Sequence, residues 1–232
     1  MQSRWRGRRG RERAITGNRQ TSWAFADAYG DELVESAESE ALRWARARAQ
    51  EAGLRPVSPG SGATLRLLAA ASGAKAIAEI GTGTGVSGIH LLHGMRPDGV
   101  LTTVDVDAER QQFARQAFRA AGFAGNRARI IPGRALDVLP RLADGGYDLV
   151  FCDGDRREYG AYLAESLRLL RQGGLICFEG VFADGHTVES APPPLEVREL
   201  RELLRTVRES TALVPSLLPV GDGLLCAVKR EA

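Results

Sequence analysis

An alternating run of glycines is the stretch of this chain whose residue types point most directly to chemistry. Gly81, Gly83 and Gly85 follow a short apolar segment, 76–80, and precede a segment with a helical pattern. Glycine lets the backbone turn tightly and approach a ligand where a Cβ would collide, and the start of a helix presents free N–H groups. The stretch therefore predicts a nucleotide-binding turn between a buried strand and a helix.

The spacing of the glycines separates two kinds of nucleotide site. A dinucleotide fingerprint needs a glycine at the sixth position counted from Gly81, and that position is Val86. Instead, Glu79 precedes the first glycine, and a second acid, Asp105, ends the next strand-like segment. A carboxylate there can accept hydrogen bonds from both hydroxyl groups of an adenosyl ribose. Glu79 and Ser87 can face the ammonium and carboxylate ends of a ligand. This motif resembles that of class I S-adenosylmethionine-dependent methyltransferases.

The elements expected around this turn alternate along the chain. Strands are expected at 76–80, 100–104, 128–131, 147–152, 175–178, 213–215 and 223–228. Helices are expected at 21–52, 61–72, 84–95, 107–121, 136–143, 159–170 and 192–209, with Asp31 as a cap of the first. The alternation predicts an α/β, Rossmann-like fold with a seven-stranded, mostly parallel sheet and helices on both faces. Residues 21–232 are expected to form one domain, with an N-terminal helical cap (21–72) and a core (73–232).

Composition is ordinary for a globular enzyme, with 44% hydrophobic and 26% charged residues. No apolar run approaches the roughly 20 residues that cross a bilayer, and no hydrophobic segment follows the N-terminal charges. We therefore expect no membrane contact and a cytoplasmic location. Residues 1–20 hold seven arginines and one acid. They lack interleaved aromatic residues, so we expect a disordered basic leader, and nucleic acid is not the expected partner.

The three cysteines and the three histidines, His90, His93 and His186, have no metal-ligand spacing. Cys152, Cys177 and Cys226 lie far apart in apolar segments, which indicates reduced, buried thiols. His90 and His93 share one face of a predicted helix, and we expect both at the helix surface.

The chain from about residue 57 to 228 resembles the O-methyltransferases of the catechol and caffeoyl-CoA type, and most closely their actinobacterial branch. The segments that carry the resemblance are 57–60, 79–87, 133–140, 147–155 and 169–174. It implies S-adenosylmethionine as the cofactor. The residues implied to contact this cofactor are Val57, Glu79, Gly81, Thr82, Gly83, Ser87, Asp105 and Val106, with Ala135 near the adenine.

The resemblance also implies a divalent cation, Mg²⁺, which binds the acceptor oxygens and lowers their pKa. The implied ligands are an Asp after the fourth strand and an Asp-Asn pair after the fifth. Asp153 matches the first, but the pair is replaced by Glu179 and Gly180, and a lysine expected near Asp153 is replaced by Arg156. Asp153 and Arg156 are therefore the candidate catalytic residues. Asp153 and Glu179 are the candidate metal ligands, with Asp155 as a further carboxylate.

Several functions are compatible with these departures. The first is methyl transfer to the hydroxyl of a small aromatic acceptor through a weakened Mg²⁺ site. The second is the same transfer without metal, in which Arg156 steadies an anionic acceptor. A third is a cofactor-binding protein without catalysis, and a fourth is an RNA methyltransferase that uses the arginine-rich leader. The N-terminal helices are expected to cover the active site or to form a homodimer contact.

Overall fold

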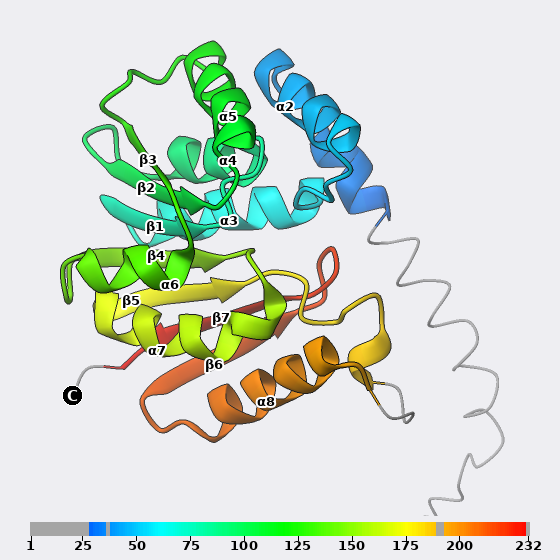
Figure 1. Ribbon diagram of the computed structural model, residues 1–232, viewed down its shortest axis with the longest axis vertical. Helices are drawn as coiled ribbons and strands as arrows, with labels where there is room; N and C mark the ends of the chain where they lie inside the picture. Colours follow the sequence, from blue (N-terminus) through cyan, green and yellow to red (C-terminus); the bar gives the residue numbers. More distant parts are fainter. Residues whose placement is uncertain (1–27, 36–37, 189–192, 231–232) are drawn as a thin grey trace, which may run out of the picture.

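The protein is described by a computed structural model that covers residues 28–35, 38–188 and 193–230. Within these residues seven strands form one sheet, in the order β3-β2-β1-β4-β5-β7-β6 (Figure 1). The strands are β1 (Ala76–Ile80), β2 (Val100–Asp105), β3 (Ala128–Pro132), β4 (Tyr147–Cys152), β5 (Leu170–Phe178), β6 (Leu213–Leu218) and β7 (Leu224–Lys229). The strands β1 to β5 pair in parallel, whereas β7 pairs antiparallel with both β5 and β6.

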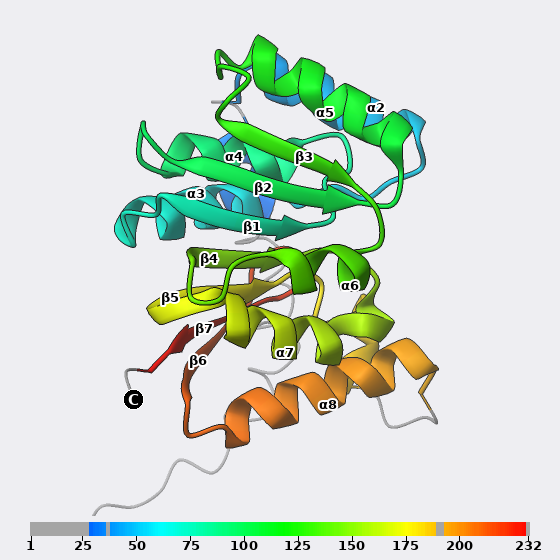
Figure 2. The ribbon, with the colours of Figure 1, turned by 60° about the vertical axis from the view of Figure 1, so that its left-hand side comes forward.

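Helices cover both faces of this sheet. They are α2 (Glu40–Glu51), α3 (Pro59–Ala71), α4 (Val86–Gly94), α5 (Ala108–Ala120), α6 (Ala135–Val138), α7 (Tyr159–Leu169) and α8 (Leu195–Glu209). Short 3₁₀ turns lie at Leu139–Arg141, Arg156–Glu158 and His186–Val188. Figure 2 shows α6 and α7 on the near side of the sheet and α3 and α4 on the far side. The predicted Rossmann-like α/β fold is confirmed.

The alternation of side chains along the strands gives one core on each face. In β4, Val150 and Cys152 pack with residues of α7 and α8, whereas Leu149 and Phe151 pack with residues of α3, α4 and α5. Successive residues of a strand point to opposite faces, so a strand buried on both sides reads as a continuous apolar run. All three cysteines are free and buried in these cores, as predicted.

The first predicted helix differs from the structure. The chain is helical over 28–35 but is not helical at 38–39, and α2 begins only after Ser39, whose side chain caps it. Asp31 lies inside the earlier helical segment, where its carboxylate accepts a hydrogen bond from the backbone N–H of Gly60 at 2.6 Å. The prediction of Asp31 as a cap of its own helix was wrong, because the side chain instead binds the start of α3.

A buried polar cluster fastens α2 to the core and corrects the expectation for His90. Glu38, at the break before α2, accepts hydrogen bonds from the Arg46 guanidinium at 2.7 and 2.9 Å. His90 is buried next to them, with Nε2 at 3.9 Å from the Glu38 carboxylate, because α3 packs so closely on α4 that a Cβ added to Gly62 would collide with the His90 ring. Burial, together with the charge of Arg46, lowers the pKa of His90 to about 4. His90 is therefore a neutral interior residue, whereas His93 is exposed.

The fifth strand is longer than predicted. The strand β5 begins at Leu170 rather than at residue 175, and it takes in the two glycines expected to precede it, because Leu170 pairs with Tyr147 ahead of a register shift.

The predicted basic leader, 1–20, lies outside the described residues. In the parts of the chain that the structure describes, no helix is both long enough and apolar enough to cross a membrane.

Candidate functional site

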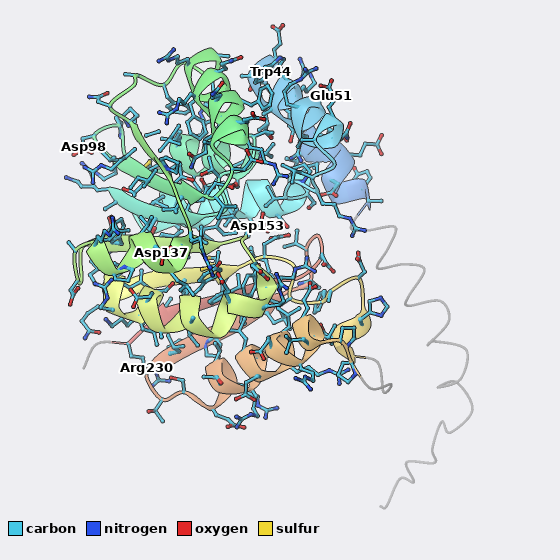
Figure 3. All side chains as sticks on the ribbon, viewed as in Figure 1. Trp44, Glu51, Asp98, Asp137, Asp153 and Arg230 are labelled. Atoms are coloured by element: carbon cyan, nitrogen blue, oxygen red, sulfur yellow. The ribbon has the colours of Figure 1, made fainter. Side chains whose placement is uncertain are left out.

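A cavity of about 620 Å³ opens at the carboxyl ends of the parallel strands. It lies where ligands bind in open α/β sheets, beside the point at which the strand order reverses between β1 and β4. Eight of the nine predicted cofactor residues line it: Val57, Gly81, Thr82, Gly83, Ser87, Asp105, Val106 and Ala135. Asp153 also lines this cavity, and Figure 3 shows it near the centre of the molecule.

The glycine turn between β1 and α4 forms one wall of the cavity. Gly81 has φ +98°, and a Cβ at this position would lie 2.4 Å from the carbonyl oxygen of Asp153. Its backbone N–H donates to the carbonyl of Val104 at 2.8 Å, which joins the turn to β2. Only glycine combines this backbone conformation with such a close approach to the loop after β4.

The Asp105 carboxylate is fixed at the edge of the cavity by two backbone groups. Its Oδ2 accepts from the N–H of Gly83 at 2.8 Å, and its Oδ1 accepts from the N–H of Asp107 at 2.9 Å. Each oxygen keeps a lone pair for a further donor. The next residue, Val106, lines the cavity with a side chain that is 68% exposed, which leaves an apolar face for a flat ring.

Glu79 lies behind the turn instead of in the cavity wall. Its side chain is fully buried, and its Oε1 accepts a hydrogen bond at 2.6 Å from the hydroxyl of Ser87, which does line the cavity. Burial raises the pKa of Glu79 to about 7. Glu79 therefore does not itself line the cavity but contacts Ser87, which does, and a direct contact of Glu79 with the cofactor stays a prediction.

A group of acids surrounds Arg156 beside the cavity. Glu179, directly after β5, is buried, and its Oε1 accepts from the Ser61 hydroxyl at 3.0 Å. Burial raises the pKa of Asp153 to about 7 and that of Glu179 to about 8. Arg156 donates to Glu196 in α8 and to Asp222 in the loop before β7, at 3.1 Å each. Arg156 itself does not line the cavity.

These acids do not form a metal-binding cluster. Asp155, the third carboxylate expected there, instead binds Arg157, and Gly180 carries no side-chain donor. Among the residues that the structure describes, no group of three or more His, Cys, Asp or Glu side chains is arranged to hold an ion. The predicted ligands Asp153 and Glu179 thus belong to the same end of the sheet but lack a third partner.

The architecture and the cavity have counterparts in known proteins. A family model described as O-methyltransferase matches residues 33–230. The chain belongs to the O-methyltransferase family. A Mycobacterium tuberculosis protein with the name "Probable O-methyltransferase" is 47% identical over 207 residues, which are 89% of this chain and 90% of that protein. The resemblance that the sequence motifs carried is confirmed.

Two solved structures are similar to this O-methyltransferase in fold. The O-methyltransferase TomG from Streptomyces achromogenes, in complex with S-adenosylmethionine, has a TM-score of 0.81 at 29% identity and covers 91% of this chain and 99% of its own. An O-methyltransferase from Bacillus cereus, in complex with SAH, has a TM-score of 0.80 at 26% identity and covers 90% of this chain and 99% of its own.

The sequence of this O-methyltransferase did not predict two of the acids that contact Arg156. Glu196 and Asp222 reach Arg156 from elements 40 and 66 residues away along the chain. Nothing local marks Glu196, one of several acids on a charged helix. Asp222 lies between Gly221 and Gly223, both with positive φ, so its glycine-flanked turn was the only sequence signal that a side chain is presented there.

We expect the pH dependence of stability to report on Glu79. Its pKa rises from 4.5 to about 7 on folding, so the folded protein binds an extra proton between these values. The contribution of Glu79 to the free energy of unfolding is therefore greatest below its unfolded pKa and is lost as the pH rises through 7. The loss amounts to roughly 3 kcal/mol. The Glu79→Gln variant, uncharged throughout, should lack this part of the decline.

Thermal unfolding of the ligand-free protein from about pH 5 to about pH 8 measures this difference. The exposed residue Glu109 provides a matched control, because Glu109→Gln removes the same charge without removing a buried carboxyl. A Glu79→Gln variant whose melting temperature follows that of the wild type across the range would show that Glu79 does not titrate in this way.

Proposed function

We propose that this O-methyltransferase binds S-adenosylmethionine in the cavity and transfers its methyl group to a hydroxyl of a small aromatic acceptor. The observation that carries the proposal is the Asp105 carboxylate, fixed by two backbone N–H groups at the edge of a cavity that the adjacent glycine turn also lines. Such a carboxylate suits the paired hydroxyl groups of a ribose.

The cavity wall suggests where each part of the cofactor would bind. Asp105 would hold the ribose, and the adenine would lie between Val106 and Ala135. The methionine end would meet the turn and Ser87, whose hydroxyl is already oriented by Glu79. The Streptomyces relative in complex with S-adenosylmethionine and the Bacillus relative in complex with SAH support this choice of cofactor.

The reaction is an in-line displacement at the methyl carbon. A bond forms between the acceptor oxygen and that carbon while the carbon–sulfur bond breaks, and its electron pair stays on sulfur, which becomes a neutral thioether. The hydroxyl proton leaves to solvent. The contribution of the protein is to align oxygen, carbon and sulfur and to exclude competing water. Asp153, half-buried at the cavity wall, would place a carboxyl group beside the cationic sulfonium.

The Mg²⁺ that the resemblance implied does not fit these residues. A magnesium site needs near-octahedral oxygen donors, and Asp153 and Glu179 are the two carboxylates available. The described residues provide no third acid in position, and Arg156 lies against Gly180 where a further ligand would stand. We therefore assign no step to a metal. A homodimer through the N-terminal helices stays a prediction.

Calorimetry followed by product analysis tests this proposal. S-adenosylmethionine should bind at one site per chain, and a panel of phenols and catechols should then yield a methylated product by mass spectrometry. The binding-only alternative predicts the same titration with no product from any acceptor. A protein that takes up no S-adenosylmethionine contradicts the proposal directly.

A further inference from the structure

The guanidinium group of Arg156 fills the space next to Gly180. A Cβ built on Gly180 would lie 2.1 Å from Nη2 of Arg156 and 2.7 Å from its Cζ. Contacts this short do not occur between real atoms of these types. Either residue 180 lacks a side chain or the guanidinium moves, so the chain has placed a fixed cation where a second ligating side chain after β5 would otherwise project.

Arg156 is held in this place from two sides. Nη1 donates to Glu196 of α8, and Nη2 donates to Asp222 of the loop before β7, both at 3.1 Å. The other oxygen of Asp222 accepts from the backbone N–H of Asp184 at 2.8 Å, which fixes that carboxylate in turn. These bonds use two of the five N–H groups of the guanidinium, and the side chain is 27% exposed. A partly open, anchored cation therefore faces the remaining acids.

The positive charge acts on both candidate metal ligands. Burial raises the pKa of Asp153 and of Glu179, and the nearby charge of Arg156 lowers the pKa of each. Arg156 binds the carboxylates of Glu196 and Asp222 directly. Its charge also acts on the carboxyl groups of Asp153 and Glu179. A divalent cation placed between Asp153 and Glu179 would be repelled by this guanidinium at short range, and its two ligands would have to leave their present surroundings.

We propose that Arg156 is the resident cation of this acid group and takes the place of a divalent metal, so that this O-methyltransferase binds no metal ion between Asp153 and Glu179. Arg156 is a positioning residue in this scheme. It ties the loop after β4 to α8 and to the loop before β7, and it supplies the positive charge that the buried acids require. Its value for methyl transfer rests on the proposed function, but its exclusion of metal does not.

Manganese binding followed by electron paramagnetic resonance tests the proposal. The samples are the full-length wild type, Arg156→Ala, Gly180→Asn and the double variant, each saturated with S-adenosylmethionine. Asparagine is chosen because it tolerates the φ of +72° at residue 180 better than other side chains. We expect the free-manganese signal to persist with the wild type and to fall with the double variant, in which the guanidinium is gone and a third oxygen donor has been added.

Thermal unfolding of the same four proteins gives a second, independent measurement. Gly180→Asn alone should lower the melting temperature by roughly 5 °C, since its Cβ collides with the guanidinium. The same change in the Arg156→Ala background should cost much less, because the collision is relieved. The difference between these two effects on the melting temperature is the coupling between positions 156 and 180, and it can be measured even where manganese binding is weak.

Three outcomes would overturn the proposal. They are stoichiometric manganese uptake by the wild type, failure of the double variant to take up manganese, and equal effects of Gly180→Asn in the two backgrounds. Titration of each sample with S-adenosylmethionine separates this from the proposed function. A wild type that binds both S-adenosylmethionine and manganese contradicts the inference alone, whereas one that binds neither contradicts the proposed function and leaves the inference standing.

Discussion

Replacing Asp105 by alanine is expected to weaken the binding of S-adenosylmethionine by roughly 100-fold. The proposed ribose contact comprises two hydrogen bonds to a charged acceptor, each contributing about 1.5 kcal/mol. The carboxylate also accepts from the N–H groups of Gly83 and Asp107, so its removal loosens the rim of the cavity as well as deleting the contact. Calorimetric titration measures the change.

The neighbouring Asp107 provides the matched control. Its side chain caps α5 by accepting from the N–H groups of Glu109 and Arg110, and it does not line the cavity. Asp107→Ala should cost about 1 kcal/mol of folding stability. It should leave the affinity for the cofactor close to that of the wild type. Equal affinities of the Asp105→Ala variant and the wild type would refute the ribose assignment.

The Gly81→Ala variant is expected to lose both stability and cofactor binding. A Cβ at this position meets the backbone of Asp153 at 2.4 Å, and φ is +98°, so the turn must move away from the loop after β4. Backbone strain and the collision together should cost roughly 3–5 kcal/mol. A domain of this size would then melt roughly 10 °C lower. Thermal unfolding and a cofactor titration of the surviving folded protein measure the two effects.

Gly83 shows how much of this cost comes from the collision. It also has a positive φ, +49°, but the nearest atom to its added Cβ is in the Leu54 side chain at 3.9 Å. Gly83→Ala should therefore cost about 1 kcal/mol, which is the strain of the left-handed conformation alone. If both alanine variants lost the same stability, the close approach of the glycine turn to the loop after β4 would not explain the glycine at position 81.

Features that depend on neighbouring residues in the sequence were predictable, and features that depend on distant partners were not. Alternating apolar segments and the glycine turn were sufficient to predict the sheet and the placement of Asp105 and Ser87 at one edge. The break before α2 was missed because the apolar stripe continues across it in the sequence, although Ser39 caps α2. The burial of His90 was missed for a related reason, since a histidine on a short helix reads as a surface residue until α3 covers it.

The same limit applies within the candidate site. The departure at Glu179 and Gly180 was visible as a change of residue type, but its meaning was open between a weak metal site and none. The answer proposed above rests on the positions of the Arg156 guanidinium, Glu196 and Asp222, three groups from separate segments. Side-chain direction after a strand end is set by tertiary packing, and no local pattern encodes it.

The contact between Arg156 and Gly180 constrains the order in which these two positions can change during evolution. A side chain gained at residue 180 while the arginine is present meets Nη2 at 2.1 Å, so that step passes through a destabilised intermediate. Loss of the arginine first opens the space and leaves Glu196 and Asp222, both partly exposed, without their partner. Conversion of the cation-bearing form of this site into a ligand-bearing form is therefore expected to change position 156 before position 180, and the opposite conversion is expected to change position 180 before position 156.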